Sequence, residues 1–372
     1  MVKKSQQKMS VPFLKPEVYA SDVQRMVRCI ESGWFTHGKY TDAFERKLAA
    51  HVRAESAVMV ASCTAALHIS LILAGIKEGD EVITTPLSYV ATSNVILYQR
   101  AKPVFVDVDP DTGLIDAKKV EEKITKRTKA IMPVHLYGQM ADMKKLNAIA
   151  RKHKLVIVED AAHAVEARRD GVAPGELGFT ACFSFHTAKN LTSGQGGAIT
   201  VQDKSLVSKI RLLRRDGVTN IGDRRRMLSF GYKYDATDLQ AALLTGQMDR
   251  LRASHAKRRA VLVRYREGFA GTKIRFPKIV QGATHAGHLF VVWVDSKKRD
   301  HIRHELAAAG IETSIHYEPI HLEPYYCETF GFKKGDFPVA ERLGASVIAL
   351  PTYSRLTARE QDYIIEKLRA LI

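Results

Sequence analysis

The sequence is poor in cysteine. Its 372 residues contain four, Cys29, Cys63, Cys182 and Cys327, and no two of them have the short spacing of a disulfide or zinc pair. This argues against a disulfide scaffold and a metal site, and it fits a reducing compartment. The first ten residues are polar and basic, with no apolar run of a signal peptide after them. We therefore expect a cytoplasmic protein without a metal, in which residues 1–8 form a mobile tail.

A long uninterrupted apolar run is also missing. Residues 57–75 contain no Asp, Glu, Lys or Arg, but Ser62, Thr64, His68 and Ser70 interrupt them. We interpret this segment as a strand, a polar turn and a buried helix rather than a membrane span, and we expect no membrane partner. No internal repeat or low-complexity linker is visible. The length allows two domains, and 45% apolar with 26% charged residues is ordinary for a soluble globular protein.

Positive charge is abundant, with a formal net charge of +17. It occurs in short, separated groups, 3–4, 224–226, 257–259 and 297–299. Such groups suit a solvated surface, the attraction of a nucleotide diphosphate, or nucleic acid. No nucleic-acid-binding motif accompanies them, so we expect no nucleic-acid partner.

The first 214 residues alternate between apolar and amphipathic segments. Apolar strands without period-two alternation, separated by amphipathic helices, predict a parallel or mixed sheet covered on both faces. The predicted strands are 57–61, 81–85, 103–108, 130–135, 155–159, 181–185 and 197–201, and the predicted helices are 65–74, 89–99, 117–124, 143–152 and 206–214.

The pattern changes after residue 235. Apolar residues recur at helical spacing over 235–269, which predicts a long helix leading into a second domain. Strands at 288–295 and 311–317 and helices at 301–309 and 357–371 then predict an α+β unit. We place a large domain at 1–250 and a small one at 251–372.

One lysine stands directly after a predicted buried strand. Lys189 lies in the stretch Ser184-Phe-His-Thr-Ala-Lys-Asn190 and is followed by the glycine-rich segment 194–197. Apolar walls lower the pKa of a lysine amine and make it a nucleophile, whereas a solvated lysine in a hairpin loop is the plainer alternative. An earlier buried strand ends at Asp160 and is followed by His163. These two residues are further polar groups at the end of a strand.

Together these two stretches resemble pyridoxal-phosphate (PLP) enzymes of the aspartate aminotransferase fold, and more narrowly the DegT/DnrJ/EryC1/StrS family of nucleotide-sugar aminotransferases. The resemblance runs from about Ser32 to the C-terminus. It implies an α/β protein of PLP-dependent transferase fold type I, in which a large domain with a mostly parallel seven-stranded sheet precedes a smaller C-terminal α+β domain. It also implies that Lys189 binds the cofactor covalently and moves a proton. Asp160 would keep the ring nitrogen protonated, because opposite charges favour both charged forms.

The same resemblance assigns cofactor contacts. Residues 62–65 precede a predicted helix whose free amides suit a phosphate, although an ordinary N-cap is the alternative. The expected phosphate contacts are Thr64 and Ala65, with Ser184 as a further donor. Tyr89 is expected to stack on the ring, although from sequence alone such a tyrosine is more often core.

Two further contacts follow from the family pattern. His163 would stand beside the phenolic oxygen of the cofactor. Lys233, within 231–238, would hold the cofactor phosphate of the neighbouring subunit, so a homodimer with shared sites is implied.

Substrate contacts are expected from two loops and from His186. In the loop 32–38, Trp34 and Thr36 would lie near the substrate, and the alternative is a helix terminator with a buried Trp34. In the stretch 316–321, Tyr317 and His321 would contact the sugar nucleotide.

The implied reaction transfers an amino group, from L-glutamate, to C4 of a UDP-linked 4-keto sugar during surface polysaccharide or glycan precursor synthesis. Gln195 stands where the C4-aminating members often have Glu, which leaves a 3-keto sugar as an alternative. A PLP-dependent dehydratase is less favoured, because that group has histidine in place of Lys189. A non-catalytic regulatory or nucleic-acid-binding protein is the remaining alternative.

Overall fold

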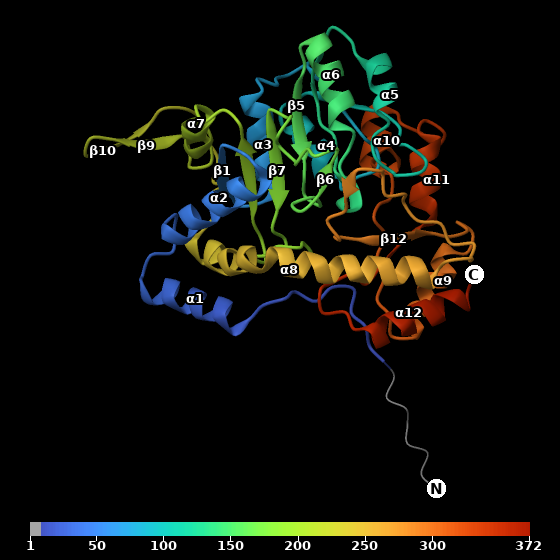
Figure 1. Ribbon diagram of the computed structural model, residues 1–372. Coiled ribbons are helices and arrows are strands. Elements are labelled where there is room, and N and C mark those ends of the chain that lie inside the picture. Colours follow the sequence, from blue (N-terminus) through green and yellow to red (C-terminus); the bar gives the residue numbers. More distant parts are fainter. Residues whose placement is uncertain (1–8) are drawn as a thin grey trace.

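A computed structural model describes residues 9–372, so the predicted tail at 1–8 lies outside the described residues. A seven-stranded sheet forms the centre (Figure 1). β8 is antiparallel to both of its neighbours, and the other pairs are parallel. The predicted α/β class with a mostly parallel sheet is thereby confirmed. The strand order is β1 (Ser56–Val60), β8 (Gly197–Val201), β7 (Thr180–Ser184), β5 (Val156–Asp160), β4 (Thr128–Ile131), β2 (Glu81–Thr84) and β3 (Lys102–Phe105).

Successive side chains of the strands enter two separate apolar cores. In β1, Ala57 and Met59 pack into one core, whereas Val58 and Val60 pack into the other. Each fully buried aliphatic side chain contributes about 1.5–3 kcal/mol, which explains why these strands are apolar on both faces. One core is covered by α3 (Cys63–Leu73), α4 (Ala91–Tyr98) and α7 (Leu206–Leu213), and the other by α2 (Lys39–Val52), α5 (Ala117–Val120), α6 (Met143–His153) and α8 (Asp238–Gly268).

The long helix α8 joins the sheet to the C-terminal elements. Thr237 and Gln240 form a capping box at its start, and its 31 residues span about 46 Å. Its first half packs into a core of the sheet through Leu244, and its second half packs into the C-terminal core through Tyr265. Figure 1 shows α8 running along one end of the sheet. The predicted domain boundary at residue 250 falls inside this helix, and the division into 1–250 and 251–372 stays a prediction.

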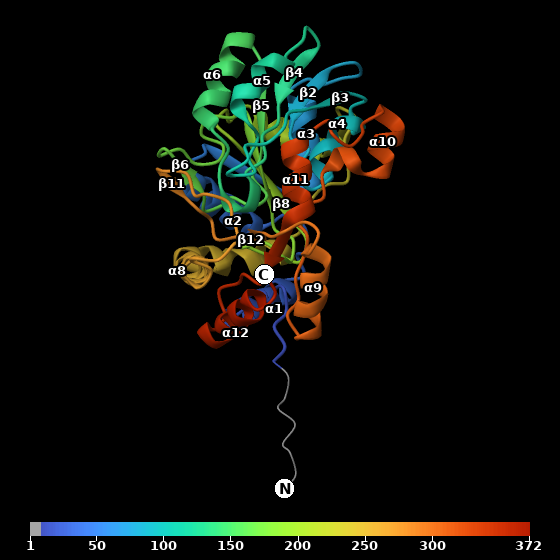
Figure 2. The same ribbon diagram turned by 90° about the vertical axis from the view of Figure 1, so that its right-hand side faces the viewer.

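The C-terminal part is built on a two-stranded ladder. β12 (Phe290–Trp293) pairs with β13 (Val347–Leu350), and α9 (Arg299–Ala308) and α12 (Ala358–Arg369) pack against them (Figure 2). The predicted strand 311–317 is wrong. That segment makes isolated bridges only, from Ile311 to Val11 and from Ser314 to Ala349, because it crosses from one partner segment to another and sustains no ladder.

Several helices and strands were not predicted from the sequence. They include α1 (Ala20–Glu31), α2, α10 (Pro324–Phe330), α11 (Pro338–Ser346), the hairpin of β9 (Val218–Ile221) with β10 (Arg224–Met227), and the short pair β6 (Arg168–Arg169) with β11 (Ala283–Thr284). The β9–β10 hairpin projects away from the body (Figure 1). The segment 57–75 forms β1, a turn and the buried α3, as interpreted. Over residues 9–372, no helix is both long and apolar enough to cross a bilayer.

Candidate active site

The sequence-predicted polar groups gather at one edge of the sheet. β1, β5 and β7 run in the same direction, since β1 and β7 are both antiparallel to β8. Their carboxyl ends therefore meet at one edge, the usual place for a ligand site in an open α/β sheet. β5 ends at Asp160, β7 ends at Ser184, and β1 leads directly into the residues 62–65.

Asp160 is a buried carboxylate with few partners. It is 5% exposed, and its Oδ2 accepts a hydrogen bond from Thr92 Oγ1 at 2.8 Å, while its Oδ1 accepts one from the Ala162 N–H at 3.2 Å. Burial raises its pKa, and the Thr92 and Ala162 bonds and the charge of Lys189 oppose this rise. A buried carboxylate with few partners is stabilised most by a neighbouring cation. The protonated ring nitrogen of PLP would be such a cation.

Lys189 lies in the turn after β7, where its N–H donates to the His186 carbonyl at 2.8 Å. Burial lowers the pKa of its amine to about 8, although the charges of Cys63 and Asp160 act in the opposite direction. The charges of Lys189 and Asp160 act on each other, so the structure brings these two predicted residues together. Such an amine is substantially neutral near pH 8 and available as a base or nucleophile.

A group of neutral histidines borders these residues. His163 Nδ1 accepts from the Tyr137 N–H at 3.3 Å, so its Nε2 carries the proton and donates to Tyr317 Oη at 3.2 Å. The His163 ring lies 4.3 Å from that of His288. Burial, together with the charge of Lys189, lowers the pKa values of both rings well below the ordinary value. His163 therefore joins Tyr317 to the site, and its predicted contact with the phenolic oxygen of the cofactor stays a prediction.

Asn190 ties the lysine turn to the rest of the protein. Its Nδ2 donates to Glu166 Oε2 and to the Ala286 carbonyl, both at 2.9 Å, and its Oδ1 pairs with His288 Nδ1 at 3.3 Å. Glu166 in turn forms a buried ion pair with Arg258 of α8 at 2.7 Å. The roles of these supporting residues and of Thr92 were not predicted from the sequence. Asn190 follows Lys189 in the lysine motif, but nothing local in the sequence distinguishes the others.

The start of α3 offers amides to an anion. Ser62 Oγ caps the helix by accepting from the Ala65 N–H at 3.1 Å, and the Ala66 N–H donates to the Ser62 carbonyl. The N–H groups of Cys63 and Thr64 precede the first intrahelical bond and have no partner in the part of the chain that the structure describes. The ordinary N-cap is therefore present, and it occupies the N–H of Ala65, one of the two predicted phosphate contacts. The free N–H groups are those of Cys63 and Thr64, and the phosphate site stays a prediction.

β8 approaches this turn closely. A Cβ on Gly197 would lie 2.3 Å from the carbonyl carbon of Ser62 and 2.6 Å from the nitrogen of Cys63. Only glycine therefore fits here, which explains Gly197 in the glycine-rich segment that follows Lys189.

Three of the predicted contacts have exposed or half-exposed side chains near the edge. Tyr89 precedes α4 and is 61% exposed rather than core, with its ring 6.1 Å from that of Tyr317. Ser184 is partly buried and accepts a weak hydrogen bond from the His186 N–H at 3.4 Å. His186 itself is exposed. Tyr89 is thus joined to the cluster through Tyr317, and its stacking role stays a prediction.

The remaining predicted contacts with exposed side chains are Trp34, Thr36 and Lys233. Trp34 is 60% exposed in the loop after α1, and Thr36 is exposed as well, so the alternative of a buried Trp34 is wrong. Lys233 is exposed and forms ion pairs with Asp235 at 2.8 Å and with Asp216. Surfaces of this kind are free to meet a second subunit.

His321 is fully buried. Its Nε2 pairs with Glu341 Oε1 at 3.0 Å, and its ring packs edge-on against Phe337. The predicted contact between His321 and a substrate is not supported by this arrangement, which leaves no open face on the ring.

The sheet has a lysine and a buried carboxylate at its carboxyl edge. This arrangement defines the class of fold type I transferases. More narrowly, the chain belongs to the DegT/DnrJ/EryC1/StrS aminotransferase family, whose family model matches residues 16–369. The family resemblance and the prediction of an aminotransferase are thereby confirmed.

Similar proteins cover nearly the whole chain. It is 38% identical over 377 residues to the spore coat polysaccharide biosynthesis protein SpsC of Bacillus subtilis, covering 97% of each. It is 36% identical over 362 residues to the GDP-perosamine synthase of Caulobacter vibrioides, covering 95% of this chain and 96% of the relative. Among solved structures, Streptococcus pneumoniae Spr1654 in its PLP form matches with a TM-score of 0.94 and 31% identity over 98% of both chains, and it is also known in a PMP form.

Proposed function

We propose that this protein is a PLP-dependent aminotransferase that places an amino group on the keto carbon of a nucleotide-diphosphate sugar. The observation that carries the proposal is the placement of Asp160 at the carboxyl end of β5 and of Lys189 in the turn after the neighbouring parallel strand β7, where the charge of each acts on the other. The family and the PLP and PMP forms of Spr1654 support the cofactor, which is PLP. SpsC and the GDP-perosamine synthase support a sugar substrate.

The residues at the edge fit this cofactor chemically. Lys189 would hold the aldehyde and Asp160 the ring nitrogen, and the amides of Cys63 and Thr64 with Ser184 would hold the phosphate. When bound, PLP supplies the electron sink that makes the substrate carbon acidic. The Lys189 amine, with its pKa of about 8, takes up and returns a proton at Nζ near neutral pH. Burial raises the pKa of Asp160, but a cationic partner and the hydrogen bonds from Thr92 and the Ala162 N–H favour its charged form.

The finer assignments are proposed from the family pattern. We infer L-glutamate as the amino donor and C4 of a UDP-linked 4-keto sugar as the acceptor, for surface polysaccharide or glycan precursor synthesis in the cytoplasm. The net charge of +17 favours an anionic substrate such as a nucleotide diphosphate. A homodimer is also proposed, in which the exposed Trp34, Thr36 and Lys233 and the partner's equivalents complete two sites.

The first test measures cofactor binding. Protein incubated with PLP should show the visible absorbance of the lysine-bound cofactor, and Lys189→Ala should lose it. Lys129→Ala, which changes an exposed lysine on β4, is the matched control and should retain it. A non-catalytic protein on this fold would show no absorbance difference between these variants.

The second test identifies the substrate. L-Glutamate should convert the bound cofactor to its amine form, and a keto sugar nucleotide should convert it back. A panel of UDP-, GDP- and dTDP-linked 4-keto and 3-keto sugars separates the proposed acceptor from the 3-keto alternative, and mass spectrometry detects a dehydrated product. Return of the cofactor by a 3-keto sugar only, or loss of water without amination, would contradict the proposed acceptor.

A further inference from the structure

A second cavity lies against the lysine turn. It is enclosed by the arm 14–17, the turn 187–192, the α8 residues between Gln247 and Arg258, and the loop 352–354. It shares Lys189, Asn190 and Leu191 with the cavity that His163 and Ser184 line. The turn that carries the catalytic amine therefore borders two cavities.

Two buried hydrogen-bond donors of this cavity have no partner. Tyr353 is 6% exposed and Arg258 is 4% exposed, and both line the cavity. Neither Tyr353 Oη nor Arg258 Nε has a hydrogen-bond partner within residues 9–372. Leaving a buried donor unpaired costs about 1–3 kcal/mol, so two such donors at one cavity indicate an acceptor that belongs there. Burial raises the pKa of Tyr353 to about 12, so its hydroxyl remains a donor at neutral pH.

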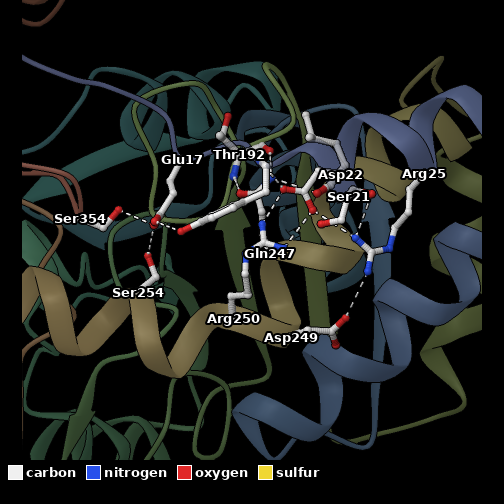
Figure 3. A network of polar contacts seen from close by, with 12 residues as sticks. Glu17, Ser21, Asp22, Arg25, Thr192, Gln247, Asp249, Arg250, Ser254 and Ser354 are labelled. Carbon is white, nitrogen blue, oxygen red and sulfur yellow. Dashed lines mark hydrogen bonds and ion pairs between the residues drawn. The ribbon is translucent and has the colours of Figure 1, made fainter.

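The charges at the cavity favour an anion. Lys15, Lys189, Arg250 and Arg258 line it, with Glu17 as the acidic residue among the lining side chains. Figure 3 shows that Glu17 is already satisfied, because Ser254 Oγ and Ser354 Oγ donate to its Oε2 at 3.0 and 2.5 Å. Its Oε1 accepts from Tyr19 and pairs with Lys257 at 3.3 Å. Glu17 thus forms part of the wall and does not compete for the free donors.

Of the basic side chains other than Lys189, Arg250 and Arg258 have acidic partners and Lys15 does not. Arg250 pairs with Asp22 and Arg258 with Glu166. Lys15 is exposed at the rim and forms no ion pair within the described residues. Its positive charge therefore remains available to a bound anion.

The size of the cavity limits the ligand. About 50 Å³ is open to it, and since one water needs about 10–15 Å³ on the same measure, it holds a few heavy atoms. A carboxylate or a phosphate group fits, whereas a nucleotide sugar does not. Both are acceptor-rich anions and match two donors and a lysine.

We propose that this cavity is a small-oxyanion site, which takes a carboxylate or phosphate group on Tyr353 Oη and Arg258 Nε with Lys15 at the rim. The bound anion would contact the turn 187–192 within a cavity that His163 does not line. Binding would order that turn, and by reciprocity any ligand that orders the turn would strengthen anion binding. The site does not depend on the proposed reaction, because its test measures anion binding rather than turnover.

The test titrates the PLP-loaded protein with inorganic phosphate and, separately, with sodium acetate, at constant ionic strength set with sodium chloride. Isothermal titration calorimetry measures the affinity, and hydrogen exchange measures protection of 187–192. We expect saturable binding of at least one anion and slower exchange of the turn. Phosphate and acetate as separate arms distinguish the two sources of oxyanion.

Tyr353→Phe removes one hydroxyl and should weaken binding about tenfold. Tyr363→Phe is the matched control, because that hydroxyl donates to the Ala309 carbonyl outside the cavity, and its affinity should equal that of the wild type. Lys15→Ala should weaken binding several-fold, and it decides the question if Tyr353→Phe does not fold.

Three results would overturn the proposal. They are the absence of saturable binding, a response that chloride reproduces, and binding that neither Tyr353→Phe nor Lys15→Ala changes. The last result would place the anion elsewhere on the basic surface.

Discussion

The lowered pKa of Lys189 predicts how the reactivity of its amine depends on pH. An ordinary lysine has a pKa of about 10.4, so less than about 1% of it is neutral at pH 8. Burial lowers the pKa of Lys189 to about 8, so about half of it is neutral there. In the protein without PLP, acylation of Lys189 by acetic anhydride should therefore level off above about pH 9. An ordinary lysine continues to gain reactivity through pH 10.

Peptide-resolved mass spectrometry after brief labelling measures this profile, with exposed lysines as internal references for the reagent. The stability of the same protein provides an independent measure. Between about pH 8 and 10.5 the folded chain binds fewer protons at Lys189 than the unfolded chain, so stability rises with pH over that window. The penalty of burying the charge is fully present below pH 8.

Lys189→Met should consequently stabilise the cofactor-free protein at pH 7 by about 1–3 kcal/mol, an amount that allows for the partial exposure of the side chain. This gain should shrink as the pH rises toward 10.5. Lys129→Met, on the surface, should change the free energy of unfolding by less than about 0.5 kcal/mol. A labelling profile that rises through pH 10, together with no stabilisation by Lys189→Met, would refute the claim that burial controls this amine.

Three further substitutions test the surroundings. Thr92→Val removes the hydroxyl that donates to Asp160. It should lower transaminase kcat about tenfold and the free energy of unfolding by about 1–2 kcal/mol. Thr92→Ser should restore both quantities, which stopped-time assays and urea melts measure. Glu17→Gln should destabilise the protein by about 1–3 kcal/mol at pH 7. The hydrogen bonds from Ser354, Tyr19 and Ser254 outweigh burial and lower the Glu17 pKa to about 2. The difference in the free energy of unfolding between the wild type and Glu17→Gln should therefore disappear as the pH falls from about 4.5 to 2. A difference that does not change with pH would contradict this. Gly197→Ala places a Cβ on the Ser62 backbone and should cost about 3 kcal/mol or more in thermal unfolding, with a loss of PLP affinity at equilibrium dialysis.

The sheet could be predicted because its strands carry their own signal. Each of the seven is an apolar run between polar turns, and the residues at their ends, Asp160 and Ser184, follow from where the runs stop. α1 and α2 were not predicted, although Phe44, Leu48 and Val52 recur at helical spacing and are buried in α2. Segment 311–317 has the composition of a strand, but whether it forms one depends on partners that are distant in the sequence.

The supporting residues of the site could not be predicted for the same reason. Thr92 reaches Asp160 across 68 positions, and Arg258 reaches Glu166 across 92. Each has an unremarkable local sequence, and its partner is fixed only when the sheet order is known. The tautomer of His163 likewise depends on the Tyr137 N–H, which is 26 residues away. Motifs therefore identify the groups that react, whereas the fold alone identifies the groups that hold them.

The opposite pKa shifts of Asp160 and Lys189 have one cause. Burial disfavours the charged form of each, which raises the pKa of the carboxyl and lowers that of the amine. Without PLP, this edge of the sheet is therefore electrostatically unfavourable, and attraction between the two residues only partly compensates. A ligand that brings a cation to Asp160 and uses the neutral amine of Lys189 relieves both penalties at once. Since such a ligand binds the folded state alone, the apparent stability should rise with its concentration, and Asp160→Asn or Lys189→Met should each gain less from it than the wild type.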